Sequence, residues 1–183
     1  MKFKETPLKG SFEIDLEPFK DDRGWFARTY CKNEFRQIGH EKEWVQLNHS
    51  FTVKKGSLRG MHFQYPPYSE IKMVRCIAGA VYDVIVDIRK ESPGFLKWFA
   101  LELSAANKKM LYIPEGFAHG FQTLSDHTEL IYHHSSFYVQ GHEGGLRYDD
   151  KKLNIKWPLP VTEISERDKQ HPDIAEDFKG INL

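Results

Sequence analysis

The sequence predicts a mostly β protein, folded as an antiparallel sandwich or barrel with few short helices. Short runs of β-branched and aromatic residues recur along the middle of the chain, and clusters of Gly, Pro, Ser and Asp separate them at fairly regular intervals. Helical patterning is scarce by comparison. The chain has 183 residues, which is within the range of one compact domain and enough for a sizeable buried core. We therefore expect a single domain over residues 1–183.

The two ends of the chain and one internal segment supply the minor elements. An N-terminal strand segment is expected over about residues 1–17 and could add to the sheet of a partner chain. A short helical turn, NEFRQI, is predicted with Asn33 as its cap and Gly39 at its end. The polar C-terminal tail, about residues 166–183, is expected to carry one short helix.

The strands of the sandwich occupy the middle of the sequence. Residues 71–89 contain two apolar runs that meet at Ala78-Gly79, which predicts a β-hairpin. Another turn is expected at Ser125-Asp126, between FAHGFQTL and ELIYHHSSFY. The remaining predicted strands are KWFALEL (97–103) and MLYIP (110–114).

Composition excludes several classes of function. Twenty-six basic residues balance twenty-six acidic ones, so the broad basic face of a nucleic-acid binder is not expected, although one small anion pocket is compatible with this balance. No run approaches the ~18 apolar residues of a membrane span, and the first residues lack the apolar stretch of a signal peptide. Cys31 and Cys76 show no CxxC spacing and are interpreted as free thiols of a reducing compartment. We expect a cytoplasmic protein that binds neither nucleic acid nor membrane.

Two stretches resemble the halves of the metal-binding cupin signature. GSLRGMHFQ (56–64) places His62 at the expected distance from its first glycine, and IPEGFAHGF (113–121) supplies the Pro-x-Gly-x2-His of the second half. These matches predict a cupin-like jelly roll. A catalytic metal in such a fold needs three or four His or carboxylate ligands. Gln64 replaces one histidine and leaves His62 and His119, so we expect no metal.

His62 can serve in other chemistry. An imidazole transfers protons readily because its unperturbed pKa of ~6.5 lies near the operating pH. Arg59 precedes His62 closely and Lys72 follows it, so the three would converge in a small barrel. Because buried cations without an anion are costly, such a cluster predicts an anionic ligand. The alternative is a hydrogen-bonded core histidine.

Several long motifs, in order over about residues 18–170, resemble the dTDP-4-dehydrorhamnose 3,5-epimerase family. They are DDRGWFARTY, VQLNHS, SLRGMHFQ, KMVRCIAGAVYDVIVDIRKESPGF, YIPEGFAHGFQTLSD, EGGLRYDDKKLNIKWP and ISERD. The resemblance implies a cupin-like jelly roll, a homodimer and a reaction without cofactor. The implied substrate is a nucleoside-diphosphate 4-keto-6-deoxyhexose of deoxysugar and surface polysaccharide synthesis. Its 4-ketone acidifies the C–H bonds at C3 and C5, and the enzyme inverts one or both centres.

The resemblance also implies roles for individual residues. His62 resembles the general base and Asp168 its carboxylate partner. Lys72 resembles the group that stabilises the enolate oxygen, and Tyr132 the acid that returns a proton to the opposite face. The implied substrate contacts are Arg23 and Arg59 on the pyrophosphate, Tyr138 stacked on the nucleobase, and Gln46, Asn48, His119, Glu143 and Arg167.

Plainer interpretations exist for some of these residues. Tyr132 or Tyr138 could be a core residue of one strand, Asp168 could cap the terminal helix, and Arg23 could be a turn residue. Three further histidines lack the two-part metal spacing and are expected at the surface or in supporting positions. They are His133, His134 and His142.

Two positions depart from the pattern of the family. Arg28 stands where a glutamate is typical, and Leu47 stands where an aspartate is typical. Both are expected on the nucleotide side, so Arg28 is counted among the substrate-binding candidates and the base stays open among dTDP, CDP and GDP. The competing functions are a single-centre epimerase, a sugar ketoisomerase on the same fold, a metal-dependent cupin and a non-catalytic sugar-nucleotide binding module.

Overall fold

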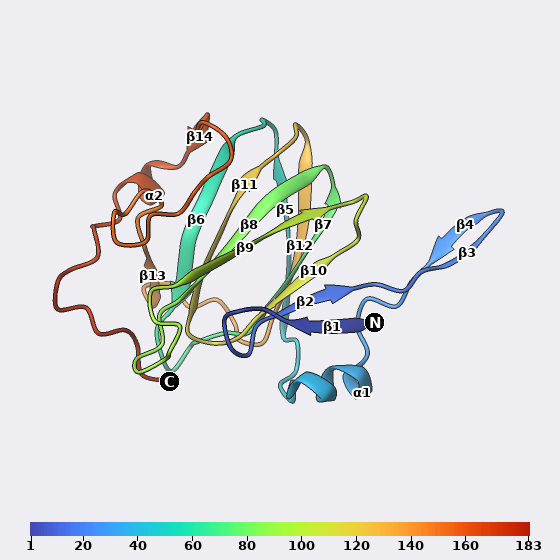
Figure 1. Cartoon of the computed structure of the whole chain (residues 1–183), viewed down its shortest axis with the longest axis horizontal. Coiled ribbons are helices and arrows are strands. Elements are labelled where there is room, and N and C mark those ends of the chain that lie inside the picture. The colour runs from blue at the N-terminus through green and yellow to red at the C-terminus, as the bar shows by residue number, and fades with distance from the viewer.

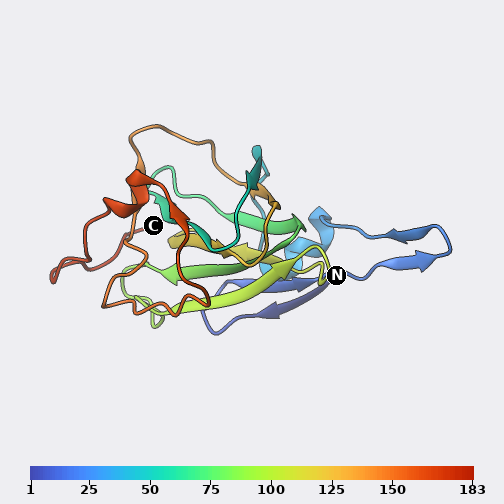
Figure 2. The same ribbon diagram turned by 90° about the horizontal axis from the view of Figure 1, so that it is seen from above.

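Two largely antiparallel sheets face each other in the computed structural model, which describes all 183 residues (Figures 1 and 2). The first sheet has the strand order β1 (Lys2–Glu5), β2 (Phe12–Asp15), β10 (Met110–Ile113), β7 (Lys72–Ala78), β12 (Thr128–His134) and β5 (Gln46–Thr52). The second has the order β13 (Glu143–Gly145), β6 (Ser57–Gln64), β11 (Phe117–Thr123), β8 (Ala80–Asp87) and β9 (Trp98–Ser104), and β14 (Glu163–Ile164) pairs in parallel with β6. The predicted mostly β sandwich is confirmed.

The second sheet is buried on both faces. Its alternate residues Val81 and Ile85 pack between the sheets against Val74 and Leu130 of the first sheet. The opposite set, including Val84, packs under the C-terminal part of the chain. Because full burial of one such side chain contributes about 1.5–3 kcal/mol, these two clusters supply much of the stability of the scaffold.

The predicted hairpin at Ala78-Gly79 is wrong. Strands β7 and β8 do not pair with each other: β7 pairs with β10 and β12, and β8 pairs with β9 and β11. Gly79, with φ of 72°, turns the chain from one sheet into the other. The turn at Ser125-Asp126 makes the same crossing from β11 to β12. Residue alternation predicts that a segment is a strand, but it does not say which strand lies beside it.

Helices are short, as expected, and neither is long and apolar enough to cross a membrane. Helix α1 (Lys32–Phe35) continues into a 3-10 turn (Arg36–Ile38), and Gly39, with φ of 75°, ends it. Its N-cap is Cys31, so the predicted cap at Asn33 is wrong: Asn33 lies inside the first turn. Helix α2 (Glu166–Lys169) is a single turn capped by Ser165.

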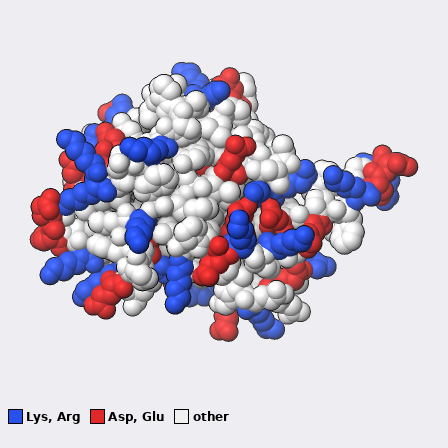
Figure 3. All heavy atoms as spheres, viewed as in Figure 1, with Lys and Arg blue, Asp and Glu red and all other residues white.

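The N-terminal segment contributes to the sheet of its own chain. Strands β1 and β2 pair with each other, and β2 pairs with β10. The next two strands, β3 (Phe19–Asp21) and β4 (Gly24–Phe26), pair only with each other and project away from the two sheets (Figures 1 and 2). We call them the N-terminal hairpin. On the face shown in Figure 3, acidic and basic side chains are interspersed rather than gathered by sign.

Candidate functional site

Three adjoining cavities meet at His62. The Tyr132 cavity, of about 570 Å³, is lined by Arg59, Lys72, His119 and Tyr132 among others. The Tyr138 cavity, of about 510 Å³, is lined by Gln46, Gln64, Glu70, Tyr138, Glu143 and Arg167 among others. The third, of about 460 Å³, is lined by Arg59, Arg167 and Asp168 among others. His62 is the one residue that lines all three, and Asn48, Lys72 and His134 are shared by the first two.

An irregularity in strand β6 puts two functional side chains on the same face. His62 lies opposite His119 and Arg59 lies opposite Phe121, with a register shift between the two pairs. Residues three apart would otherwise face opposite sides of a strand. Gly60 permits the shift because its φ is 134° and an added Cβ would lie 2.5 Å from the Cα of Gly120.

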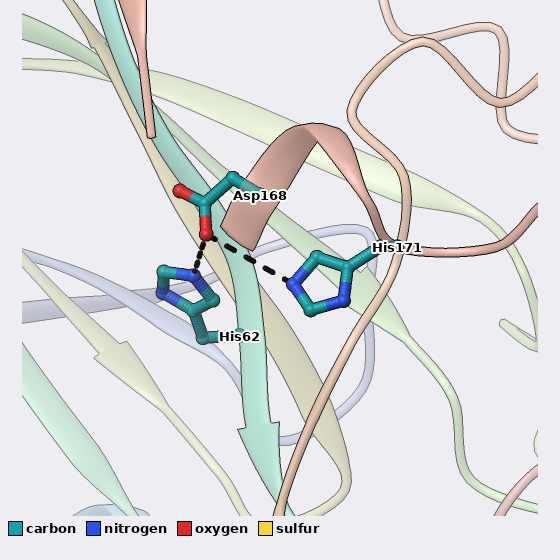
Figure 4. A group of neighbouring side chains, drawn as sticks. All are labelled: His62, Asp168 and His171. Carbon is teal, nitrogen blue, oxygen red and sulfur yellow. Dashed lines mark hydrogen bonds and ion pairs between the residues drawn. The ribbon is translucent and has the colours of Figure 1, made fainter. Parts of the chain in front are cut away.

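His62 and Asp168 form a hydrogen-bonded pair (Figure 4). His62 Nε2 lies 2.7 Å from Asp168 Oδ1, and the backbone N–H of Gly60 donates to Oδ2 at 3.1 Å. Burial alone would raise the pKa of Asp168, but the hydrogen bond and charge of His62, with the Gly60 amide, hold it below its ordinary value. Because the carboxylate accepts from Nε2, the neutral form of the His62 ring has its free lone pair on Nδ1. Asp168 is not the cap of α2, because the Ser165 hydroxyl accepts from the Asp168 N–H.

Lys72 lies at one end of a chain of hydrogen bonds. Its Nζ is 3.0 Å from Glu70 Oε1, and the other oxygen of Glu70 accepts from His134 Nδ1 at 2.6 Å. Burial would raise the pKa of Glu70, but the charge of Lys72 and the hydrogen bond from His134 bring it below its ordinary value. All three side chains are nearly inaccessible. The Lys72 ammonium is thus held by an ionised partner.

The same chain of hydrogen bonds continues to the Tyr138 cavity. Asn48 Nδ2 donates to His134 Nε2 at 3.3 Å, and Gln46 Nε2 donates to Asn48 Oδ1 at 3.1 Å. Gln46 Oε1 then accepts from the backbone N–H of Tyr138 at 3.0 Å. Lys72 and the segment that carries Tyr138 are therefore connected through four polar side chains.

Tyr132 faces the cavity from the sheet opposite His62. Its hydroxyl lies 3.0 Å from Ser50 Oγ on the neighbouring strand β5. Burial raises the pKa of this phenol well above its ordinary value, so it stays protonated at neutral pH. The His119 ring lies 6.3 Å away in an edge-to-face arrangement, and its Nε2 is 3.0 Å from both oxygens of the fully buried Asp83.

More exposed polar residues also line the three cavities. The Arg59 guanidinium donates to Thr52 Oγ1 and to the Phe51 carbonyl, both at 3.2 Å. Tyr138 follows the end of β12 instead of alternating with Tyr132 on that strand. Its hydroxyl donates to Glu143 at 2.8 Å, and Arg167 lies 3.4 Å from the same carboxylate.

Two of the sequence-predicted binding residues lie apart from all three cavities. Arg23 is in the turn of the N-terminal hairpin, where its side chain is 90% exposed and pairs with Asp21. Arg28 follows the hairpin and pairs with Glu34 at 2.7 Å. Neither lines a cavity that contains His62. All the other predicted site residues line at least one of them.

Sequence reasoning missed several groups that support the site. His134 takes the second of its two expected positions, since it is buried and supports the site through Glu70 and Asn48. The groups that the sequence reasoning did not find are Asp83, Ser50 and Glu70. Asp83 was detectable as a lone charge inside the apolar run VYDVIVD, where a buried charge requires a partner. Ser50 shares the face of Asn48 on β5. Glu70 lies just before strand β7, and no feature of the sequence pattern indicates its role. His142 is exposed, as expected.

Comparison with known proteins decides the family. The family model described as dTDP-4-dehydrorhamnose 3,5-epimerase matches residues 5–176. The chain belongs to this family. A dTDP-4-dehydrorhamnose 3,5-epimerase from Shigella flexneri is 48% identical over 169 residues, which cover 92% of this chain and 93% of the relative. The protein is therefore an isomerase, an epimerase of deoxysugar biosynthesis.

Solved structures of the family share the fold. The crystal structure of a dTDP-4-dehydrorhamnose 3,5-epimerase from Bacillus anthracis, with TDP and PPi bound, is 39% identical with a TM-score of 0.91 and covers 94% of this chain and 99% of that one. A 3,5-epimerase from Legionella pneumophila, in complex with dTDP-4-keto-L-rhamnose, is 35% identical with a TM-score of 0.86 and covers 91% and 89%. The predicted cupin-like jelly roll is confirmed.

Proposed function

We propose that this epimerase inverts both C3 and C5 of a dTDP-linked 4-keto-6-deoxyhexose, with His62 as base, Lys72 as the enolate-stabilising cation and Tyr132 as acid. One observation carries the proposal. His62 projects from β6 of the second sheet and Tyr132 from β12 of the first, and both line the same cavity with Lys72. Inversion requires that a proton leaves one face of the sugar ring and another arrives on the opposite face. Groups on facing sheets meet that requirement.

The proposed reaction begins at the carbon beside the ketone. His62 Nδ1, whose lone pair is free because Nε2 donates to Asp168, removes the proton at C3 or C5. The C–H electron pair forms a C=C bond to C4, and the π electrons of the C4 ketone move onto its oxygen. This oxygen becomes an enolate oxygen beside the Lys72 ammonium. Asp168 stabilises the imidazolium. A buried ammonium aimed at this developing charge is the kind of preorganised partner that contributes several kcal/mol to catalysis.

The second half of the proposed reaction returns a proton from the other side. The Tyr132 phenol stays protonated because burial raises its pKa, and transfer of its proton to carbon collapses the enolate to the ketone. The phenolate is then reprotonated through Ser50 or solvent, and His62 loses its extra proton to water. Since C3 and C5 both flank the ketone, the same groups serve both centres. General acid–base catalysis of this kind contributes about 10²–10⁴-fold.

The nucleotide is proposed to occupy the Tyr138 cavity and the surface around Arg59. Tyr138 is exposed and offers a ring face for the base, and the Arg59 guanidinium suits a diphosphate. Thymine is the proposed base because the Bacillus anthracis and Legionella pneumophila relatives carry TDP and a dTDP-sugar. Gln46, Asn48, Glu143 and Arg167 are the proposed polar contacts of this cavity, and His119 is a proposed contact of the sugar.

A homodimer is part of the proposal. Arg23 and Arg28 cannot bind a nucleotide in the cavities of their own chain, because the N-terminal hairpin projects away from them (Figure 1). The hairpin also exposes Phe19 and Phe26, at 76% and 72%. Exposed aromatic groups and a free edge strand, β5, are features that association covers. We place Arg23 and Arg28 at the nucleotide of a second copy.

Solvent isotope exchange tests the proposed function. The purified protein is incubated in deuterated water with 4-keto-6-deoxyhexoses linked to dTDP, CDP and GDP, and the products are analysed by NMR for label and stereochemistry. Inverted, labelled C3 and C5 in the dTDP sugar, with much slower turnover of the other two, is the expected result. Label at one centre only would restrict the enzyme to a single inversion. Absence of label from every nucleotide sugar, or unchanged labelling by His62→Ala, overturns the proposal.

A further inference from the structure

A third side chain approaches the His62–Asp168 pair. His171 follows α2 closely in sequence, and its Nε2 lies 3.9 Å from Asp168 Oδ1, the oxygen that also accepts from His62. Figure 4 shows both imidazole rings next to one oxygen of the carboxylate, each with a nitrogen directed toward that oxygen. The nearest ligand atoms of the three residues all lie within 4.8 Å of one another.

The position of His171 is unusual for a histidine without a function. Its Nε2 is buried and has no hydrogen-bond partner, a condition that is rare for polar atoms in folded proteins. The ring lies directly on Gly145, where an added Cβ would lie 2.1 Å from Nε2, so a glycine is required beneath it. Gly145 in turn lies opposite His62 in the register of β13 and β6. The backbone is thus shaped to admit a second imidazole beside the first.

We propose that His62, Asp168 and His171 form an inhibitory Zn²⁺ site. Two imidazole nitrogens and one carboxylate oxygen are common zinc donors, and a fourth position stays open for water. Bonds of about 2.0–2.2 Å in a tetrahedral site place the donors roughly 3.3 Å apart. His62 Nε2 lies 2.7 Å from Asp168 Oδ1 and His171 Nε2 lies 3.9 Å from it, so one distance is shorter and the other longer than this value.

Zinc at this site blocks the base by occupying the wrong nitrogen. An imidazole bound to metal through Nε2 carries its single proton on Nδ1, the nitrogen that is proposed to take the proton from the substrate. It then has no lone pair with which to accept a proton from carbon. Because Asp168 also binds the zinc, its carboxylate no longer accepts a hydrogen bond from His62 Nε2. The loss of turnover rests on the proposed role of His62, whereas the binding of zinc does not.

Calorimetry and turnover measurements on the same samples test the site. Metal-free full-length protein is titrated with ZnCl₂, and epimerisation is followed at each zinc concentration. The wild type is expected to bind one Zn²⁺ per chain and to lose turnover in parallel, with recovery on addition of a chelator. His171→Ala and the bulkier His171→Gln are expected to keep basal turnover and to lose at least about tenfold in zinc affinity, because they remove a metal ligand. His142→Ala, an exposed histidine, is the matched control and should behave as wild type.

Co²⁺ provides an independent spectroscopic measurement. Intense tetrahedral d–d absorption in the wild type, absent from both His171 variants, supports the ligand set. Equal zinc affinity in the wild type and the His171 variants, or no stoichiometric binding by the wild type, overturns the site. Binding that leaves turnover intact overturns the inhibitory role. If metal-free protein has no epimerase activity while His171 still determines zinc affinity, the proposed function fails and the metal site stands.

Discussion

The walls of the cavities and the N-terminal hairpin hold their functional residues in different ways. Lys72 and Tyr132 project from interior strands of a six-stranded sheet, and each is fixed by a hydrogen bond to another side chain of the site. Arg23 lies in a hairpin of two three-residue strands whose residues are all exposed. An isolated two-stranded hairpin is marginal by itself. The proposed proton transfer depends on side chains that this chain brings together alone, whereas the proposed nucleotide contacts of the hairpin depend on what the hairpin packs against.

The largest expected effect is on the cavity side of this comparison. His62→Ala removes the proposed base and should lower kcat by about 10³-fold. Deuterium incorporation at C3 and C5 should fall in parallel. Asp168→Asn keeps the shape of the pair but replaces an acceptor with a donor, so it should also lose much of the activity. Near-normal exchange in His62→Ala would place the base elsewhere.

Tyr132→Phe should separate exchange from inversion. Without the phenol, His62 still removes the proton and can return a solvent deuteron to the same face, so label appears while net inversion falls by about 10²-fold. NMR of the product distinguishes label with retained configuration from label with inverted configuration. Equal loss of exchange and inversion would mean that Tyr132 acts before, or together with, proton abstraction. Ser50→Ala, which removes only the hydroxyl partner of Tyr132, should give a milder form of the same result.

Substitutions of Glu70 test whether Lys72 must be held in position by its ion-pair partner for full activity. Glu70→Ala leaves the ammonium without its ion-pair partner, and a misplacement of about 1 Å at a reacting centre can cost up to about 10²-fold in kcat. Glu70→Gln keeps an acceptor for Lys72 and should retain more activity than Glu70→Ala. The measurement is kcat and KM for both variants. If both retain wild-type kcat, Glu70 is not needed to position Lys72.

The hairpin should affect binding more than chemistry. Arg23→Ala is expected to raise KM about tenfold with a smaller change in kcat, because it removes one charged contact to the diphosphate. Mixing Arg23→Ala with His62→Ala protein provides the sharper test. In a mixed dimer, the intact cavity of one chain receives the intact hairpin of the other, so activity with native KM should reappear. If mixing restores nothing, Arg23 does not act across chains.

The smallest expected effect concerns acid stability. The pKa of Glu70 is lower in the folded state than its ordinary value of about 4.5. Ionised Glu70 therefore stabilises the folded protein at pH values above about 4.5, and this stabilisation is lost as the pH falls through the pKa of the folded state. Glu70→Gln should therefore flatten the decline of Tm below about pH 5. Asp21→Asn is the control. Its pKa is also lowered, chiefly by its hydrogen bonds to Arg23, but the pair is exposed to solvent and should change Tm little.

Sequence patterns predicted strands and motif residues better than they predicted partners. The runs on either side of Ala78-Gly79 are strands, yet they belong to opposite sheets, because alternation encodes burial and not pairing. Likewise, motif resemblance selected Lys72 but gave no indication of Glu70, whose importance comes from the fold that brings it to Lys72 and His134. His171 was invisible for the same reason: only the structure shows that Gly145 leaves space for its ring beside His62.

Arg23 is the opposite case: the sequence points to it, but the structure of one chain does not bring it to the site. The resemblance assigned it to the substrate, but a single chain does not bring it to the cavity of His62. A motif match assigns Arg23 to a nucleotide, but it does not say which copy of the chain holds that nucleotide.

The His62–Asp168 contact joins residues 106 positions apart, and every strand precedes Asp168 in the sequence. The C-terminal part of the chain that carries Asp168 also covers the outer face of the second sheet, through Leu153, Ile155, Ile174 and Ile181. The proposed carboxylate partner of His62 is therefore anchored by the same apolar contacts that cover this sheet. Loosening of that cover would separate the two side chains even while the strands of both sheets stayed paired.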